Sequence, residues 1–450
     1  MKGIGIGRRK LLLIPLVPIA LFSGTVIAQE STLKTLILTQ NSTGRRSTIM
    51  LYDYNAGSPL QIWTAKTAGI VGGVAFCDLE SDGNPEIVVS TFPGRDQYTM
   101  YGTWSFLVYQ NVSGTYELIF NKTAQSWNNL PDIARTQTID YYDNGTYFLV
   151  GVLGSRVVLV RYEHGKVTMQ EILPHGVSPY GLDIGDVNND GKPDIVYAAN
   201  WDYTFRLKIM ENHGGGQYTS RLGVGSLPYP NDGIVIGDVD GDGLNEITVV
   251  GTSRDGEVLQ VHKNIGGEYE AIWSHNISCY GSIQSVDVGD VDGDGLNEIA
   301  TAAKLCEEPP PGKLSIWKYN KSSGSFYLLW EDNGRWGANI KDMLCLRIVP
   351  LEEENEPKVV GIDRGWLYVV DRKGSGYETR IVNLFWYIGT VVSQGLDVWS
   401  GAVPVNELGA EFLLVMFIAV VLKGADRCLP DFRGRGEAPV PPARTAQYTT

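Results

Sequence analysis

An acid-rich segment of eleven residues occurs twice in this chain without a single change. Residues 237–247 and residues 289–299 both read GDVDGDGLNEI. Two related segments lie upstream, CDLESDGNPEI from Cys77 and GDVNNDGKPDI from Gly185. The last three copies start 52 residues apart, and the gap from the first copy to the second is about twice as long. A period of this length indicates an architecture in which each repeat is one supersecondary unit.

The residues on either side of each acid segment have the pattern of β-strands. In the fourth copy, the alternating sequence SIQSVDVGDV precedes the acids and the run EIATAAK follows them. This pattern predicts a hairpin with the acids in its loop. A second hairpin follows each acid segment, and its turn contains Asn and Gly, as in LQVHKNIGGEYEAIW. One repeat is therefore four antiparallel strands in about 52 residues, which is the size of a propeller blade.

Weaker repeats complete the series. Units that start near residues 140, 350 and 403 keep the turn and the following strand but not the full acid pattern. With the four acid segments they make seven units, so we expect an all-β fold, a single β-propeller of four-stranded blades, most simply seven-bladed. Six and eight blades remain alternatives. The N-terminal strands TLILTQ, STIMLYDY and LQIWTA lack a first strand, which residues 396–405 would supply, closing the ring.

The two ends of the chain differ from the repeats in composition. Basic residues precede the apolar run LLLIPLVPIALF, which predicts a signal peptide over residues 1–28, cleaved after Ala28. An uncleaved membrane anchor is the alternative, because the apolar stretch is nearly long enough to span a bilayer. The propeller is expected over residues 35–422. Residues 423–450 are rich in Pro, Arg and Gly and are predicted to form a disordered tail.

Other features agree with export to the extracellular space or the cell surface. Sequons for N-glycosylation occur at Asn41, Asn111, Asn121, Asn144, Asn276 and Asn320. The formal net charge of -14 argues against nucleic acid as a partner. The expected partner is an extracellular glycan or protein, and a membrane is expected only if the N-terminal segment stays uncleaved.

The acid segments have the spacing of calcium-binding loops. Side-chain oxygens at positions 1, 3, 5 and 9 surround the ion, Gly at position 6 permits the turn, and position 7 offers its main-chain carbonyl. All-oxygen ligands favour Ca²⁺ over softer metals, and we expect about four such sites. The predicted ligands are Asp78, Glu80, Asp82, Asn84 and Glu86; Asp186, Asn188, Asp190, Lys192 and Asp194; Asp238, Asp240, Asp242, Leu244 and Glu246; and Asp290, Asp292, Asp294, Leu296 and Glu298.

Neither an EF-hand nor a metal-free turn fits these loops as well. An EF-hand needs an acid at position 12, where Val89, Tyr197, Val249 and Thr301 stand instead. A solvated turn without metal would leave several carboxylates close together and mutually repelling. Four copies at regular spacing favour a metal.

The motif D-x-D-x-D-G-x-x-E, repeated around a propeller, resembles the FG-GAP/VCBS repeats of integrin alpha-chain propellers and of many secreted microbial proteins. The resemblance covers roughly residues 35–422 and implies the propeller fold and calcium at the acid loops. Members of that family include adhesion receptors, sugar-binding lectins and some polysaccharide lyases. Fold analogy therefore does not choose a function.

We expect a non-catalytic binding or adhesion module, since no hydrolase triad and no zinc-protease spacing occurs. A carbohydrate-active enzyme resembling polysaccharide lyases is the alternative. The connections opposite the acid loops carry aromatic residues that suit stacking on sugars or anchoring a protein, although packing between blades would account for them equally well. They are Trp104, Trp127, Tyr180, Trp201, Tyr203, Tyr229, Tyr280 and Trp336.

One disulfide is predicted, between Cys279 and Cys306. The hairpin around the fourth acid loop is centred near residue 294, so residues opposite each other have numbers that sum to about 588. The two cysteines sum to 585, which places them nearly opposite at the far end of the hairpin from the metal. Export supplies an oxidising setting.

Overall fold

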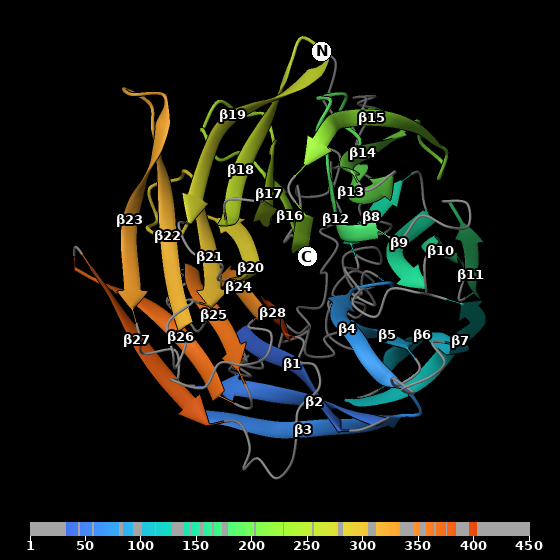
Figure 1. Ribbon diagram of the computed structural model, residues 1–450. Coiled ribbons are helices and arrows are strands. Elements are labelled where there is room, and N and C mark those ends of the chain that lie inside the picture. The colour runs from blue at the N-terminus through green and yellow to red at the C-terminus, as the bar shows by residue number, and fades with distance from the viewer. Residues whose placement is uncertain are drawn as a thin grey trace, which may run out of the picture. The chain divides into compact units, whose positions relative to one another are not determined.

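The regular elements that the computed structural model describes are all β-strands (Figure 1). The chain divides by its contacts into Met1–Ser31 and Thr32–Thr450, and the described residues all lie in the second unit. They are residues 33–402 without 44–45, 56–57, 81–83, 93–100, 113, 128–138, 144–145, 154–155, 164–165, 173–178, 202–203, 228, 254–255, 278–281, 305–311, 334–344, 351–356, 364–365, 375 and 384–395.

Six sheets are each built from four strands that follow one another along the chain, with antiparallel pairing throughout. Their strands are β4 (Ile70–Cys77), β5 (Glu86–Phe92), β6 (Tyr101–Val112) and β7 (Thr115–Trp127); β8 (Ile139–Asp143), β9 (Thr146–Leu153), β10 (Arg156–Glu163) and β11 (Lys166–Glu171); β12 (Pro179–Gly185), β13 (Asp194–Trp201), β14 (Thr204–Asn212) and β15 (Tyr218–Leu227); β16 (Tyr229–Gly237), β17 (Glu246–Ser253), β18 (Gly256–Ile265) and β19 (Glu268–Ile277); β20 (Ser282–Gly289), β21 (Glu298–Lys304), β22 (Gly312–Asn320) and β23 (Ser325–Asn333); and β24 (Cys345–Pro350), β25 (Pro357–Asp363), β26 (Trp366–Lys373) and β27 (Gly376–Asn383).

A further four-stranded sheet joins the two ends of the described chain. Its strands, in hydrogen-bonded order, are β28 (Leu396–Ala402), β1 (Leu33–Thr43), β2 (Arg46–Asn55) and β3 (Ser58–Thr67). Leu33 lies opposite Ala402, and Thr39 lies opposite Leu396. The prediction that a C-terminal strand completes the N-terminal ones is thus confirmed. Main-chain hydrogen bonds hold the beginning and the end of the propeller together.

The sheets pack against one another in sequence, and the hydrophobic core is divided among their interfaces. The first strands are successive neighbours, with β12 against β16, β20 and β24 following in turn, and β28 between β24 and β4. Between two sheets, Ile209 of β14 packs with Ile234 and Ile236 of β16 and with Ile247 of β17. Equivalent clusters lie between other neighbouring sheets. The fold is an all-β propeller of four-stranded blades.

Strand β17 shows why the inner strands have nearly continuous hydrophobic sequences. Its side chains alternate between two faces, and each face meets a neighbouring sheet. Ile247 and Val249 pack toward β14 and β16, whereas Val250 packs with Val286 and Ile299 of the next sheet. Because both faces are buried, apolar residues occur at both sets of positions, and the face of Val250 also buries Thr248. Each fully buried side chain of this size stabilises the fold by about 1.5–3 kcal/mol.

The glycine that begins the second, third and fourth acid segments is required by the close approach of neighbouring first strands. A Cβ atom built on Gly185 would lie 2.5 Å from Cγ2 of Ile236. One built on Gly237 would lie 2.7 Å from Cγ1 of Val288, and one on Gly289 would lie 2.8 Å from Cγ2 of Ile348. These distances are shorter than van der Waals contact, so only glycine fits without displacement of the next strand.

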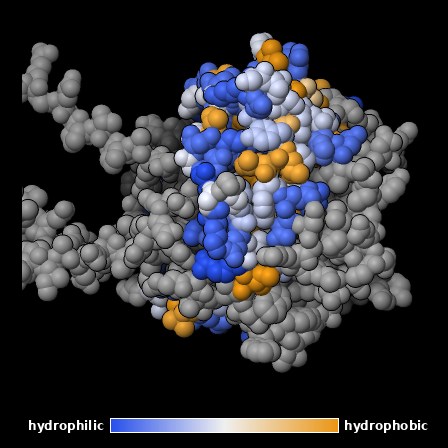
Figure 2. Space-filling model, turned by 90° about the vertical axis from the view of Figure 1, so that its left-hand side faces the viewer, coloured by the Kyte–Doolittle hydropathy of each residue, from blue (hydrophilic) through white to orange (hydrophobic). Residues whose placement is uncertain are grey.

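The fourth strands form the outer edges of the sheets, and several pairings there contain register shifts. In four sheets the shift falls at the same place, between Leu51 and Tyr52, Val108 and Tyr109, Val261 and His262, and Ile316 and Trp317. Such bulges twist an edge strand and discourage edge-to-edge association. Figure 2 shows mostly hydrophilic side chains on one described outer face, with small separate apolar patches. No helix long and apolar enough to cross a bilayer occurs in the described part of the chain.

Candidate metal centres

Each acid segment forms the loop between the first two strands of its sheet. We number the loops in chain order as loop 1 (78–85), loop 2 (186–193), loop 3 (238–245) and loop 4 (290–297). The pairs that close the four hairpins are Cys77 with Glu86, Gly185 with Asp194, Gly237 with Glu246 and Gly289 with Glu298. All four predicted hairpins are therefore present. Asp82 of loop 1 lies outside the described residues.

The aspartate at position 1 organises the loop that it begins. In loop 3, Oδ1 of Asp238 accepts a hydrogen bond from the main-chain N–H of Gly241 at 2.7 Å, and Oδ2 accepts one from Gly243 at 2.9 Å. Asp290 of loop 4 accepts from the corresponding glycines, and Asp186 of loop 2 accepts from Asp190 and Gly191. Gly243 has a φ of 89°, so the sharp turn needs a residue that tolerates the left-handed region.

The acid at position 9 is buried and fastens the loop to the strand. Oε2 of Glu246 accepts the N–H of Val239 at 3.0 Å, and Oε2 of Glu298 accepts the N–H of Val291 at 2.8 Å. Glu86 accepts the N–H of Leu79 in the same way. Neither Glu246 nor Glu298 is exposed at all. A buried carboxylate is costly unless hydrogen bonds or a cation compensate it.

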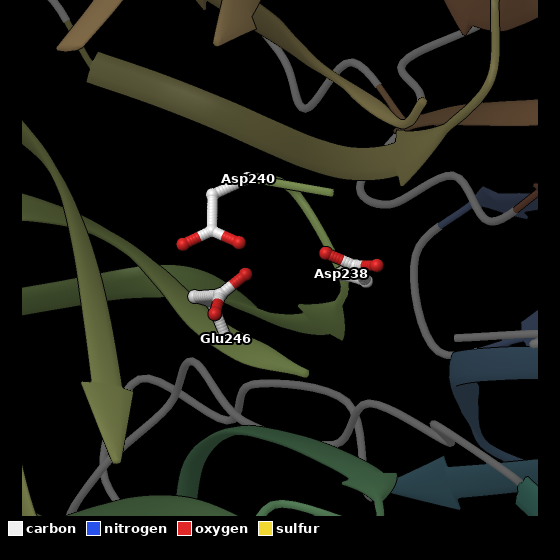
Figure 3. A group of neighbouring side chains, drawn as sticks. All are labelled: Asp238, Asp240 and Glu246. Carbon is white, nitrogen blue, oxygen red and sulfur yellow. The ribbon is translucent and has the colours of Figure 1, made fainter. Parts of the chain in front are cut away.

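Two of the loops gather carboxylates at a single place. In loop 3, one oxygen each of Asp238, Asp240 and Glu246 lies within 4.8 Å of the others, and Figure 3 shows the three side chains clustered around a shared space. In loop 4 the group is Asp290, Asp292 and Asp294, so position 5 takes the place that position 9 has in loop 3. Hard oxygen donors at this separation suit a divalent cation such as calcium. Loops 3 and 4 can therefore hold a metal ion.

A lysine from the third strand of the same sheet reaches into each of these clusters. Nζ of Lys318 lies 2.6 Å from Asp292, 2.8 Å from Asp294 and 2.8 Å from Glu298. Burial disfavours the charged form of Lys318, but its hydrogen bonds to these three carboxylates outweigh burial and raise its pKa.

Loop 3 has the equivalent lysine. Nζ of Lys263 lies 2.7 Å from Asp242 and 3.0 Å from Glu246, and it also bonds to Asp240. Neither lysine is among the site residues predicted from the sequence. The available signal was the strand sequence VHKN in the third repeat and IWKYN in the fourth, in which Lys precedes the Asn of the turn.

Loop 2 has a different charge arrangement. Asp194 at position 9 is completely buried, and its Oδ1 accepts the N–H of Asn212 at 2.9 Å. Its Oδ2 has no hydrogen-bond partner among the described residues. Burial, followed by the nearby charges of Asp190 and Asp186 and of Glu211, raises the pKa of Asp194 to about 7. A cation in this loop would compensate a carboxylate that the protein itself leaves partly unpaired.

Consecutive loops are tied to one another across the sheet interfaces. Nδ2 of Asn245 in loop 3 donates to the main-chain carbonyl of Asp186 in loop 2 at 3.0 Å. Nδ2 of Asn297 in loop 4 donates to the carbonyl of Asp238 in loop 3 at 2.9 Å. The calcium motif does not require an asparagine at position 8. In loops 3 and 4 this residue connects neighbouring blades by a hydrogen bond.

One predicted ligand-binding aromatic residue is in the core. Trp104 is 5% exposed and packs with Phe106 of its own strand and Val158 of the next sheet. The expectation that it lies on an exposed rim is wrong, and packing between blades accounts for it. Trp127, Tyr180, Trp201 and Tyr229 lie in strands, but their side chains are outside the description, as are Tyr203, Tyr280 and Trp336 as a whole.

Cys279 and Cys306, the predicted disulfide partners, also lie outside the described residues. The last described pair of their hairpin is Ser282 opposite Lys304. The prediction that Cys77 is a buried strand residue is confirmed, since it is 1% exposed in β4.

A propeller of four-stranded blades with acid loops between its first and second strands is the class of protein that the fold and the loops define. Residues 186–249 and 238–301 each match the FG-GAP-like repeat family, and these segments contain loops 2, 3 and 4. The propeller therefore contains FG-GAP-like repeats within residues 186–301, which confirms the FG-GAP resemblance seen in the sequence. No curated protein matches the chain.

Proposed function

We propose that this protein is an exported calcium-binding propeller that acts as a non-catalytic binding or adhesion module. The observation that carries the proposal is the convergence of carboxylates in loops 3 and 4 on a propeller scaffold. A cation in loops 3 and 4 would stabilise the end of the blades that carries the acid loops. The ligand would then bind to the connections at the opposite end. The ligand in this proposal is an extracellular glycan or protein.

Calcium is the metal that the donor set favours. The side-chain ligands are carboxylate and amide oxygens, and no histidine or cysteine belongs to the described clusters. Because a folded-state ligand stabilises the fold by mass action, EDTA should lower the melting temperature and added Ca²⁺ should restore it. Mg²⁺ at equal concentration should restore it less, since it demands a tighter octahedral site. A melting temperature that EDTA leaves unchanged would contradict the calcium assignment.

The proposed ligand face lies at the end of the blades away from the acid loops. It consists of the connections between second and third strands and between successive sheets, which lie largely outside the described residues. Trp201 and Trp336 are the aromatic residues we would test first, because stacking on sugars needs exposed rings. Glycan-array binding, measured with and without EDTA, tests the proposal directly. Replacing both residues by Ala should weaken retention and leave the melting temperature nearly unchanged.

The competing function is that of a carbohydrate-active enzyme. Incubation with acidic polysaccharides, followed by viscosity and by the ultraviolet absorbance of unsaturated sugars, separates the two functions. Turnover that depends on the protein would overturn the non-catalytic proposal. Binding without turnover would support it.

Two further parts of the proposal concern the ends of the chain. We propose that residues 1–28 direct export, which N-terminal sequencing of secreted protein would test. We also propose that the described sheets close into one ring of seven blades, since β28 pairs with β1 and contacts both β24 and β4. Truncation before Leu396 should then destabilise the whole domain, and a truncated protein that melts like the full chain would contradict ring closure.

A further inference from the structure

We propose that loops 3 and 4 form a coupled pair of calcium sites, in which an ion bound in one loop raises the affinity of the other. The inference rests on the proposed calcium function and adds a mode of regulation to the two carboxylate clusters on which that function is based. It follows from contacts between the two loops that involve residues of the metal-binding motif on both sides.

The first contact is between Leu296 of loop 4 and Gly241 of loop 3. A Cβ atom built on Gly241 would lie 2.5 Å from Cδ2 of Leu296, so the leucine side chain packs directly on the glycine. Leu296 occupies position 7, whose main-chain carbonyl is a predicted ligand. Gly241 lies between two other predicted ligands, Asp240 and Asp242. This contact therefore joins a ligand residue of loop 4 to the turn of loop 3 that bears ligands.

The second contact is the hydrogen bond from Nδ2 of Asn297 to the main-chain carbonyl of Asp238, at 2.9 Å. Asn297 stands between Leu296 and Glu298, the ligand residues at positions 7 and 9 of loop 4. Asp238 is the position-1 ligand of loop 3, and its side chain accepts the N–H groups that shape that loop. An ion in loop 4 would hold both chain neighbours of Asn297, and would therefore hold the amide that bonds to loop 3.

A third contact comes from the outer hairpin of the sheet that contains loop 4. Nζ of Lys321, in the turn between β22 and β23, donates to the main-chain carbonyl of Gly241 at 2.9 Å. Loop 3 is thus held by the sheet of loop 4 at two of its residues, Asp238 and Gly241. The two loops and this hairpin form one contiguous set of contacts.

Each cluster also retains a carboxylate oxygen that could accept a cation. Oδ1 of Asp292 is buried without a hydrogen-bond partner among the described residues. The same is true of Oε1 of Glu246, although Nζ of Lys263 lies 3.0 Å from it. A buried carboxylate oxygen without a hydrogen bond is costly, and a divalent cation compensates it. Both members of the pair therefore have an oxygen available for an ion.

The coupling follows from the cost of ordering a loop. A calcium ion binds only when the ligands of its loop are held in place together, and the free energy needed to order them lowers the affinity of that loop. An ion in loop 4 fixes Leu296, Glu298 and the residue between them, so the contacts that these residues make with loop 3 are fixed as well. Loop 3 then binds its ion at a smaller ordering cost.

By linkage, an ion in loop 3 favours binding in loop 4 by the same factor. Direct repulsion between the two bound ions acts in the opposite direction. A gain in affinity for the second ion can therefore come only from the contacts between the loops, and its sign distinguishes coupled loops from independent ones.

The test is calorimetric titration of the metal-free protein with CaCl₂. Glu246→Gln disables loop 3 and Glu298→Gln disables loop 4, because each removes the charge of a ligand but leaves an oxygen for the N–H group that the glutamate accepts. The double variant gives the ions bound elsewhere in the chain. Each single variant should lose one ion and should bind the ion of the other loop about tenfold more weakly than wild type does.

Variants at the contacts test whether they cause the coupling. Asn297→Ala should reduce the tenfold effect of Glu298→Gln on the ion of loop 3, and Asn297→Ala combined with Leu296→Ala should abolish it. Asn245→Ala is the matched control, since it removes the same kind of hydrogen bond between loops 2 and 3 and leaves the contacts between loops 3 and 4 in place. In that background Glu298→Gln should still weaken the ion of loop 3 about tenfold.

The outcomes separate this inference from the calcium proposal. If the ion that remains in Glu246→Gln and in Glu298→Gln binds as it does in wild type, the coupling is overturned and the calcium function stays intact. A tenfold effect that persists in the Leu296→Ala/Asn297→Ala background would also overturn the inference, because the contacts would not be its cause. If neither glutamate variant loses an ion, calcium binding at loops 3 and 4 is overturned, and the coupling with it.

Discussion

Asn297 donates a hydrogen bond from Nδ2 to the main-chain carbonyl of Asp238, 2.9 Å away in the preceding acid loop. Asn245 makes the same contact with Asp186, one blade earlier. Asp186 and Asp238 are the first residues of loops 2 and 3. The side chain of each accepts hydrogen bonds from its own loop, and the main-chain carbonyl of each accepts one from the asparagine of the next loop. These two hydrogen bonds connect loop 2 to loop 3 and loop 3 to loop 4.

The variant Asn297→Ala should lower the free energy of unfolding by about 1 kcal/mol, because it removes one hydrogen bond and leaves a carbonyl without its donor. Asn245→Ala should have a similar effect. Chemical denaturation measured by tryptophan fluorescence checks both. Gln217→Ala, at an exposed turn, serves as the control and should change stability by less than about 0.5 kcal/mol. If Asn297→Ala leaves the free energy of unfolding unchanged, the hydrogen bond between the two loops does not contribute to stability.

The variant Gly237→Ala should destabilise the propeller by about 1–3 kcal/mol, because its Cβ would lie 2.7 Å from Cγ1 of Val288 on the next first strand. Removing that methyl group should relieve the clash. The double variant Gly237→Ala/Val288→Ala is therefore expected to lose less stability than the two single losses combined.

The control for this cycle is Gly376→Ala. A Cβ atom there would meet only the carbonyl oxygen of Lys373, at 4.0 Å, so the variant should be close to wild type. If the stability loss of the double variant equals the sum of the two single losses, the clash with Val288 is not the reason why Gly237 is required.

The disulfide between Cys279 and Cys306 remains a prediction. The described register of its hairpin ends with Ser282 opposite Lys304, and a continuation of that register would bring the two cysteines within one residue of facing each other. Peptide mapping of secreted protein without reducing agent should recover the two cysteines in one linked peptide. Alkylation of both thiols before reduction would end the prediction.

The fold could be predicted to a large extent because its signals are local. The acid hairpins and the Asn-Gly turns can be recognised within single repeats, and the period of 52 residues follows from their spacing. Closure by β28 was predicted from the incomplete N-terminal repeat, and the structure confirms it with the pairing of Leu33 and Ala402. Local sequence could not place Trp104, because an aromatic residue near a strand end suits either a rim or an interface.

The two lysines could not be identified from the acid motifs, because they lie on a different strand and meet the loop only through the sheet register. Lys263 is seventeen residues after Glu246, and Lys318 is twenty after Glu298, so no fixed spacing marks them. The longer connection between β21 and β22 accounts for the difference. Comparing the third strands of the four repeats position by position would have shown Lys, Lys, Glu and Gln opposite the position-9 acids.

A buried histidine provides the last prediction. His262 of β18 lies opposite Ile247 on one side and Ala271 on the other, and it is 2% exposed. Neither of its ring nitrogens has a hydrogen-bond partner among the described residues. Burial lowers the pKa of His262 to about 4, because the charged imidazolium is poorly accommodated in the core. The corresponding position of β14, opposite Ile195, holds Met210.

The variant His262→Met should therefore gain stability relative to wild type as the medium becomes acidic. The folded-state pKa lies below the unfolded value of about 6.5, so the wild-type contribution is fully present above pH 6.5 and is lost as the pH falls toward 4. The loss amounts to up to about 3 kcal/mol, and the variant should avoid it. Free energies of unfolding at pH 7, 5.5 and 4.5 measure the difference between the two proteins. Gln217→Met, at an exposed turn, changes no titratable group and is the control that should keep the wild-type pH dependence. If the stability of His262→Met has the same pH dependence as that of wild type, protonation of His262 on unfolding does not cause the loss of stability in acid.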